Sequence, residues 1–167
     1  GYNIVTASTL VSVSSVCGIV GTVFSGLISD KMFRSNRTIP ACLSSLLNLA
    51  ALALFLFGPR QCEILDIISM ILFGISIGIL LCFLGGLMAI DIAPKEATGA
   101  AVGVIGIASY AAAGLQDVVS GFLIESRKAI VDGNPVYDFS AIRIFWLSAA
   151  LVSLLFLLII WGARTVS

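Results

Sequence analysis

Long runs of uncharged, mostly apolar residues most constrain what this chain of 167 residues can fold into. Each run is long enough to form the helix of about 20 residues that crosses roughly 30 Å of hydrocarbon. The fourth run continues past one acidic residue, Asp117, to residue 124. The five runs cover residues 1–29, 38–59, 67–90, 97–116 and 144–163.

This pattern predicts an all-α polytopic membrane protein with five transmembrane helices. In hydrocarbon only helices or closed barrels satisfy the backbone, and the runs lack the alternation of barrel strands. Five buried helices of a soluble protein would need polar outer faces, which are missing here. The charged fraction of 11% is also far below that of soluble domains, which is about 25%. The predicted spans are 6–29, 38–58, 67–90, 97–124 and 142–163.

Composition excludes several classes of function. The chain has nine basic and nine acidic residues, so its net charge is zero and gives no sign of a nucleic-acid partner. It has no histidine, and its four cysteines are scattered, which argues against the common zinc sites and against histidine acid–base catalysis. We therefore expect no metal, no cofactor and no enzymatic activity. An intramembrane enzyme would need paired acids or a nucleophile with its base, and a single acid at membrane depth is poor support.

The distribution of lysine and arginine predicts the orientation. Residues 30–37 (DKMFRSNR) hold three basic residues, and such loops are typically cytoplasmic. We expect 30–37 and 91–96 to be cytoplasmic loops, with the C-terminus on the same side and Gly1 outside. The polar loop 125–139, which contains a Gly-Asn-Pro turn signal, then lies outside.

Glycine is concentrated in the first, third and fourth spans, whereas the second and fifth are rich in leucine. Small residues let membrane helices approach closely, so we expect the glycine-rich spans to be packed inside and the others to face lipid. A stripe of serine, threonine and glycine along the first span favours helix packing or an interface between halves of a larger protein. In the fourth span the predicted packing residues are Gly99, Gly103, Gly106 and Gly114.

Tyr110 and Asp117 share the glycine face of the fourth span, because these positions advance by three or four residues. Gln116 lies on an adjoining face. A carboxylate inside a span faces a bundle interior or an aqueous cavity. Asp117 is thus predicted either to line a watery pathway or to bind another helix. Tyr110, Asp117 and Gln116 are the candidate substrate-binding residues.

The string GLISDKMFRSNR (26–37) resembles the cytoplasmic loop signature of the major facilitator superfamily, Gly-x-x-x-Asp-(Arg/Lys) followed by basic residues. Taken alone, it is equally consistent with an ordinary positively charged loop. The resemblance implies a latch that holds one conformation of a rocking transporter. Its predicted members are Gly26, Asp30, Lys31, Arg34 and Arg37.

A second string, DIAPKEATGAAVGVIGIASYAAAG (91–114), resembles the segment between helices ten and eleven of the organophosphate:phosphate antiporters. The matching positions are Asp91, Pro94, Lys95, Gly99, Ala101, Gly103, Gly106 and Tyr110. The resemblance implies that the chain is a fragment covering helices eight to twelve of a twelve-helix fold, a partial C-terminal half. It also implies that the ninth and twelfth helices, here the leucine-rich spans, are peripheral.

The resemblance further implies that Tyr110 lines the central substrate cavity. Ile79 stands where the family usually has an aromatic residue, and Asp117 and Gln116 have no family counterpart. The phosphate-binding arginines of the family lie on the first and seventh helices, which we expect upstream of Gly1. Since no span here has a central lysine or arginine, this chain is expected to supply one wall of the site.

The implied function is exchange of a sugar phosphate, a hexose phosphate or glycerol phosphate, for inorganic phosphate by alternating access in the inner (plasma) membrane. The expected partners are these phosphates, the lipid bilayer and the missing N-terminal helices. A membrane sensor of sugar phosphate, a transporter of another small organic anion, and a structural membrane subunit remain alternatives.

Overall fold

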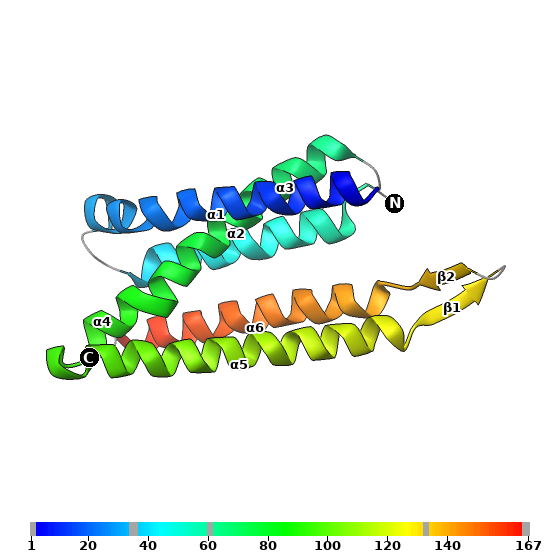
Figure 1. The fold of residues 1–167 in the computed structure, drawn as a ribbon. Coiled ribbons are helices and arrows are strands. Elements are labelled where there is room, and N and C mark those ends of the chain that lie inside the picture. Colours follow the sequence, from blue (N-terminus) through cyan, green and yellow to red (C-terminus); the bar gives the residue numbers. More distant parts are fainter. Residues whose placement is uncertain (1–2, 34–36, 60–61, 132–133, 165–167) are drawn as a thin grey trace.

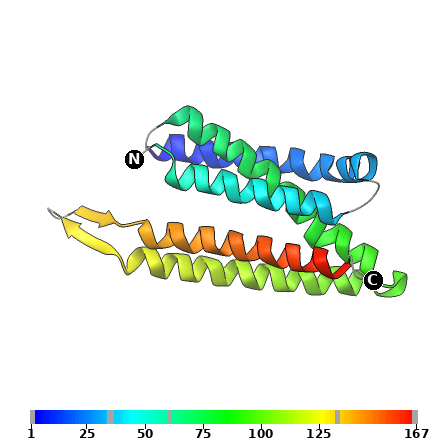
Figure 2. The ribbon, with the colours of Figure 1, turned by 180° about the vertical axis from the view of Figure 1, so that it is seen from behind.

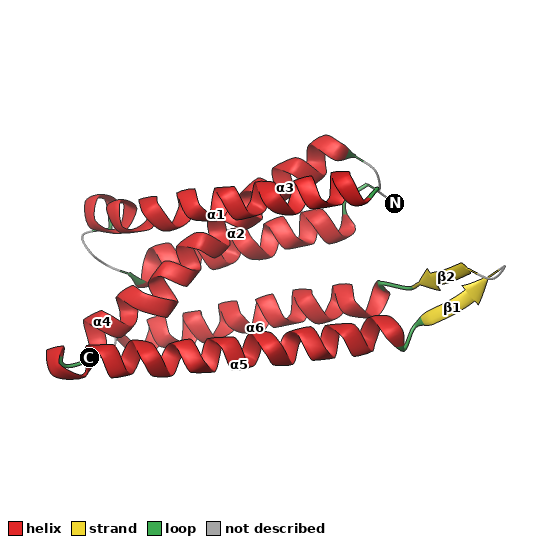
Figure 3. Ribbon diagram, viewed as in Figure 1, coloured by secondary structure: helices red, strands yellow, loops and turns green. Residues whose placement is uncertain are grey.

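The computed structural model describes residues 3–33, 37–59, 62–131 and 134–164. Six α-helices dominate it, and its strands form one small hairpin (Figure 3). The helices are α1 (Ile4–Met32), α2 (Thr38–Phe57), α3 (Glu63–Cys82), α4 (Met88–Ile92), α5 (Thr98–Glu125) and α6 (Ser140–Arg164). A π-helix, Phe83–Leu87, joins α3 to α4, and a 3₁₀ turn, Lys95–Ala97, precedes α5. The strands β1 (Lys128–Val131) and β2 (Asn134–Tyr137) pair antiparallel.

Five helical segments are long and apolar enough to cross a membrane, which confirms the predicted fold class. The third of them is continuous from Glu63 to Ile92 and includes the π-helix. Helices extend beyond the predicted spans at several ends, so that Asp30 and Asp91 lie on α1 and α4 rather than in loops. Charged residues at a helix end can reach the polar interface, so a helix can continue past the uncharged run.

The helices form two groups (Figure 1). α1, α2 and α3 pack together, and α5 and α6 run side by side in opposite directions. The long helix from α3 through α4 crosses from the first group to the start of α5, as both views show (Figures 1 and 2). α2 also packs against α6 and joins the two groups.

α1 and α3 are in direct backbone contact. A Cβ atom built on Gly74 would overlap the carbonyl group of Ser14, and one on Gly78 would overlap that of Gly18. Only glycine allows this approach, which confirms that the first and third spans pack through their glycines. The hydroxyl of Thr22 adds a hydrogen bond of 3.1 Å to the carbonyl oxygen of Gly78.

α2 buries small residues near its start and exposes two of its leucines. Its buried residues are Thr38, Pro40, Ala41, Cys42, Ser44, Ser45 and Ala51. In contrast, Leu43 and Leu46 are more than half exposed. These two leucines point away from the group, whereas Leu49 and Leu52 border cavities that α2 shares with α6.

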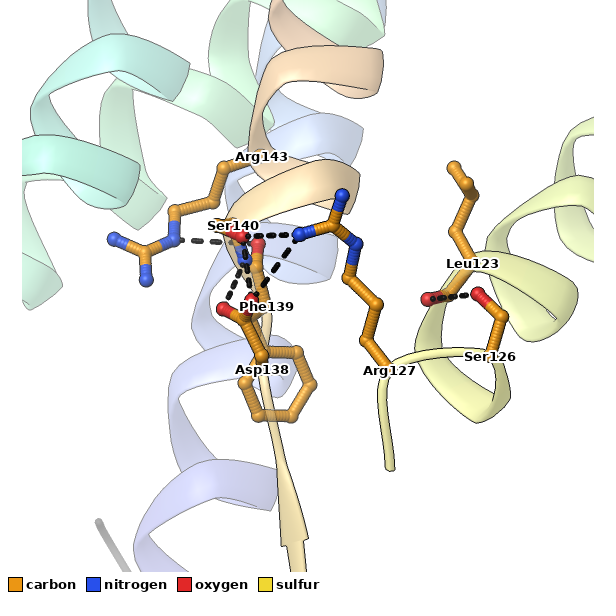
Figure 4. A network of polar contacts seen from close by, with 7 residues as sticks. All are labelled: Leu123, Ser126, Arg127, Asp138, Phe139, Ser140 and Arg143. Carbon is orange, nitrogen blue, oxygen red and sulfur yellow. Dashed lines mark hydrogen bonds and ion pairs between the residues drawn. The ribbon is translucent and has the colours of Figure 1, made fainter. Parts of the chain in front are cut away.

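A polar network closes the base of the β-hairpin (Figure 4). The carboxylate of Asp138 accepts hydrogen bonds from the backbone N–H of Ser140 at 2.9 Å and from its hydroxyl at 2.8 Å. The guanidinium of Arg127 lies 3.3 Å from the same carboxylate. These contacts connect the end of α5 to the start of α6. The sequence predicts a polar loop with a turn here, and the structure adds the two paired strands.

We expect Gly78→Ala to destabilise the folded protein, because the added methyl group meets the backbone of Gly18 rather than a side chain that could move. Overpacking of this kind costs about 1–3 kcal/mol. Thermal unfolding in detergent should show a lower Tm. Gly121→Ala is the matched control, since its methyl group meets no atom within 4 Å. Equal Tm values for the two variants would contradict the close contact.

The stability of the hairpin base should depend on pH. Hydrogen bonds from the backbone and hydroxyl of Ser140, with a smaller contribution from Arg127, lower the pKa of Asp138 below its ordinary value of 3.8. A carboxyl group with a lowered pKa adds stability that is complete above its ordinary pKa and is lost as the pH falls through the folded value. Hydrogen exchange should thus show stronger amide protection in β1 for the wild type than for Asp138→Asn at pH 7. The difference should shrink as the pH falls below 3.8 and through the lowered pKa of Asp138. Equal protection at pH 7 would exclude this role for Asp138.

Candidate functional site

The glycine face of α5 is open in this chain. Tyr110 is 84% exposed, and Asp117 is exposed on the same face. Ser120 is the one buried residue of α5 in the part of the chain that the structure describes. Tyr110 and Asp117 thus stand together on a helix surface that other segments of a longer protein could reach.

The four predicted packing glycines of α5 contact none of the described residues closely. A Cβ atom on Gly99, Gly103, Gly106 or Gly114 would meet no atom within 4 Å. These positions therefore differ from Gly74 and Gly78, where the backbone of α1 fills the space. The role of the α5 glycines in packing stays a prediction, and it requires a partner other than the described helices.

Gln116 is separated from Tyr110 and Asp117, because it borders a cavity on another side of α5. This cavity has a volume of about 420 Å³ and is mostly apolar. Asn48 of α2 lines it too, and donates a hydrogen bond of 3.3 Å to the hydroxyl of Ser76. The full lining is Asn48, Leu52, Phe55, Met70, Phe73, Ile77, Gln116, Trp146, Ala149, Ala150 and Ser153.

The sequence offered no signal for this cavity, because its lining comes from four helices and is largely ordinary membrane-facing residues. Its most polar members, Asn48 and Gln116, are amides without charge. The cavity could hold an apolar group and orient it through one or two hydrogen bonds. Nothing in its lining would neutralise a phosphate.

A cluster of three charges lies at the opposite end of the molecule from the hairpin. Arg37 donates to the carboxylate of Asp30 at 3.0 Å and to that of Asp91 at 3.2 Å. The arginine side chain is only 14% exposed, whereas the two acids are about half exposed. One planar guanidinium thus connects the end of α1, the start of α2 and the end of α4.

Each charge of this cluster lies at an unfavourable helix end. Arg37 is the residue before α2, where the helix dipole is positive. Asp30 and Asp91 are in the last turns of α1 and α4, where the dipole is negative. The opposite charges of the three groups therefore offset the unfavourable interaction of each group with its helix dipole. Arg37 is therefore more favourable in contact with the two acids than each charge is alone at its helix end.

The other predicted latch residues contribute differently. Lys31 is exposed on the last turn of α1. A Cβ atom on Gly26 would meet nothing within 4 Å, so the close helix approach expected there is not made by the described residues. Arg34 lies outside the described residues. The sequence did not predict that Asp91 pairs with Arg37, although Asp91 belongs to the second motif.

The serine stripe of α1 divides into two parts. Ser25 and Ser29 are fully buried, while Ser8, Ser12 and Ser15 are exposed. Most of the hydroxyls donate to carbonyl groups of their own helix, as that of Ser12 does to Ser8 at 2.9 Å. Such bonds satisfy serine inside hydrocarbon without a partner helix.

Comparisons with known proteins find a transporter and two membrane sensor proteins among the relatives of this chain. A glycerol-3-phosphate transporter of Bacillus subtilis (strain 168) is 29% identical over 149 residues, which cover 87% of this chain and 30% of the relative. A membrane sensor protein, UhpC, of Escherichia coli (strain K12) is 32% identical over 120 residues, or 69% of this chain and 26% of the relative. A second UhpC, from Salmonella typhimurium, is equally similar. No solved structure gives a significant match.

This chain therefore spans less than a third of the length of the curated relatives that it matches. The similarity confirms the resemblance to organophosphate transporters that the loop motifs indicated. The sequence profile of the Major Facilitator Superfamily matches residues 1–116, which is more than half of the chain. With its five helices that are long and apolar enough to cross a membrane, the chain belongs to the major facilitator superfamily.

Proposed function

We propose that this chain is part of a secondary active transporter that exchanges a sugar phosphate, either a hexose phosphate or glycerol phosphate, for inorganic phosphate. The observation that carries the proposal is the similarity of 87% of the chain to a glycerol-3-phosphate transporter. Alternating access requires no covalent chemistry: the substrate sits between two halves of the protein, and rocking exposes it to either side. The transporter is not an enzyme and uses no cofactor.

The open face of α5 forms one wall of the substrate cavity in this proposal. Tyr110 contacts the organic part of the substrate, because an exposed aromatic ring at mid-span would otherwise face lipid or another helix. Asp117 faces the same aqueous space, consistent with the cost of a carboxylate in hydrocarbon. Gln116 does not belong to this wall, because it lies on another side of α5 and lines the cavity of about 420 Å³.

The charge of the phosphate is bound elsewhere in the complete protein. The uncharged runs of this chain contain no central lysine or arginine, so basic side chains of other helices must supply the anion site. We propose that helices preceding this chain provide them. In this proposal the α5 glycines, Gly99, Gly103, Gly106 and Gly114, pack against one of those helices.

We place the transporter in the inner (plasma) membrane, with the C-terminus and the Arg37 cluster on the cytoplasmic side. The dense basic loop at residues 30–37 supports this orientation. The ion pairs of Arg37 with Asp30 and Asp91 then act as a cytoplasmic latch. Gly26, Lys31 and Arg34 belong to the same loop motif.

A sensor of sugar phosphate is a second candidate, because two of the relatives are membrane sensor proteins. A transporter of another small organic anion is a third, supported by Ile79 in place of an aromatic residue. Uptake of labelled substrates by proteoliposomes separates the three. Proteoliposomes that contain the complete protein and are loaded with inorganic phosphate should take up glycerol phosphate or hexose phosphate. Binding without uptake would favour the sensor, and uptake of other anions alone would favour the third candidate.

Tyr110→Ala should weaken exchange without preventing membrane insertion. Loss of an aromatic contact worth about 1.4 kcal/mol corresponds to a tenfold rise in the substrate concentration at half-maximal exchange. Initial rates in proteoliposomes, normalised to the amount of inserted protein, provide the measurement. Leu115→Ala is the control, since this exposed residue lies away from the Tyr110 face. Unchanged kinetics for Tyr110→Ala would refute the cavity assignment.

A further inference from the structure

An apolar groove of about 420 Å³ lies between α2 and α6, in the half of each helix that is nearer the hairpin. The α6 side of the groove extends from Ile144 to Leu151, which is about 10 Å along the helix. The hydroxyl of Ser148 borders the groove, but it donates a hydrogen bond of 2.8 Å to the carbonyl oxygen of Phe145. The large side chains of the lining are Leu49 and Phe57 from α2, with Ile144, Leu147 and Leu151 from α6.

These large side chains distinguish the groove from the close helix contacts of the chain. α1 and α3 meet through Gly74 and Gly78, and small residues of this kind are typical of helix packing in membranes. In the groove, by contrast, Phe57 is 59% and Ile144 is 65% exposed. Branched and aromatic side chains keep a second helix backbone at a distance, but a flexible hydrocarbon chain fits between them. The groove is therefore better suited to the acyl chain of a lipid than to a helix.

A guanidinium group lies at the hairpin end of the groove. Arg143 immediately precedes Ile144, and it donates a long hydrogen bond of 3.5 Å to the carbonyl oxygen of Leu56, the neighbour of Phe57. Its Nε atom donates to the carbonyl oxygen of Phe139 at 3.4 Å. A guanidinium has five N–H donors, so contacts within the described residues leave several of them available for a ligand.

This guanidinium has no counter-charge within the described part of the chain. None of the ion pairs seen there includes Arg143. The carboxylate of Asp138 is engaged by Arg127 and by Ser140 instead. In Figure 4, the guanidinium of Arg143 lies on the opposite side of Ser140 from that of Arg127 and points away from Asp138. A phosphate group could supply the missing negative charge through charge-assisted hydrogen bonds.

We propose that the groove and Arg143 together form a binding site for an anionic phospholipid. One acyl chain lies in the groove along α2 and α6, and the guanidinium binds the phosphodiester of the headgroup. An apolar groove with a cation at its end matches the two parts of such a lipid. A zwitterionic lipid is bound less well, because its ammonium group is repelled by the guanidinium. The site is separate from the face of α5 and from the proposed exchange of phosphates.

A photoactivatable phosphatidylglycerol, with a diazirine in one acyl chain, tests this site in the complete protein in detergent. Illumination followed by peptide mass spectrometry should place the label on α2 and α6 residues of the groove. Unlabelled phosphatidylglycerol should compete at a concentration about tenfold lower than phosphatidylcholine with the same chains. Dimethyl phosphate, a soluble phosphodiester, should not compete at these concentrations, because it lacks the chain that the groove binds.

Two variants separate the headgroup contact from the chain contact. Arg143→Gln should raise the competing concentration of phosphatidylglycerol about tenfold, close to that of phosphatidylcholine. Lys128→Gln is its control, because it also removes a basic charge at the hairpin end, where Lys128 is already paired with Glu125 at 2.9 Å. Ala53→Phe should prevent labelling by either lipid, because its ring fills the groove. Ala50→Phe, at an exposed position of α2 that does not line the groove, should leave labelling unchanged.

Several outcomes would overturn the lipid site. Absence of the label from the groove would do so, as would equal competition by the two lipids. Displacement by dimethyl phosphate would assign Arg143 to a soluble anion instead. Equal effects of Arg143→Gln and Lys128→Gln would exclude the headgroup contact. Because the two lipids are compared on the wild type, that comparison decides the proposal even where a variant fails to fold. The labelling does not depend on transport, so a protein without phosphate exchange could still retain the lipid site.

Discussion

The contact between the backbones of α1 and α3 determines how the other helices can be arranged. Because glycines bring the two helices together without intervening side chains, the crossing point is fixed near Gly18 and Gly78. α2 fills the remaining side of α3 with its own small residues. The far half of the long helix, beyond the π-helix, then leaves this group and meets α5. Both the open face of α5 and the charged cluster follow from this arrangement.

The charged cluster shows how a few exposed groups can connect helices that are distant in sequence. Arg37 and Asp91 are separated by 54 positions, and they meet because α2 begins where α4 ends. Neither acid would be favoured at its own helix terminus, so the arginine compensates both. Surface ion pairs are generally weak. Each of these ion pairs is therefore expected to contribute only modestly to the stability of the fold.

The sequence was sufficient for the class of protein and for the approximate helices, because uncharged runs in a membrane protein are set by the thickness of hydrocarbon. It was insufficient for the ends of the helices, since Asp30 and Asp91 interrupt the apolar pattern without interrupting the helix. The π-helix was not predictable either, because FLGGL is as apolar as its surroundings. The pairing of Asp91 with Arg37 could not be predicted either, because it depends on how α2 and α4 are arranged in the fold. The described helices leave Tyr110 and Asp117 exposed.

The nearly complete exposure of α5 also has a consequence for biosynthesis. This helix is the least apolar of the five spans, and it carries Asp117 inside its length. A single acid at the centre of a membrane helix raises the free energy of insertion by about 2.5–3.5 kcal/mol, and by less toward the ends. Since few described neighbours compensate this cost, α5 gains most from entering the bilayer together with α6. The closed base of the hairpin would then join the two helices into a single unit of insertion.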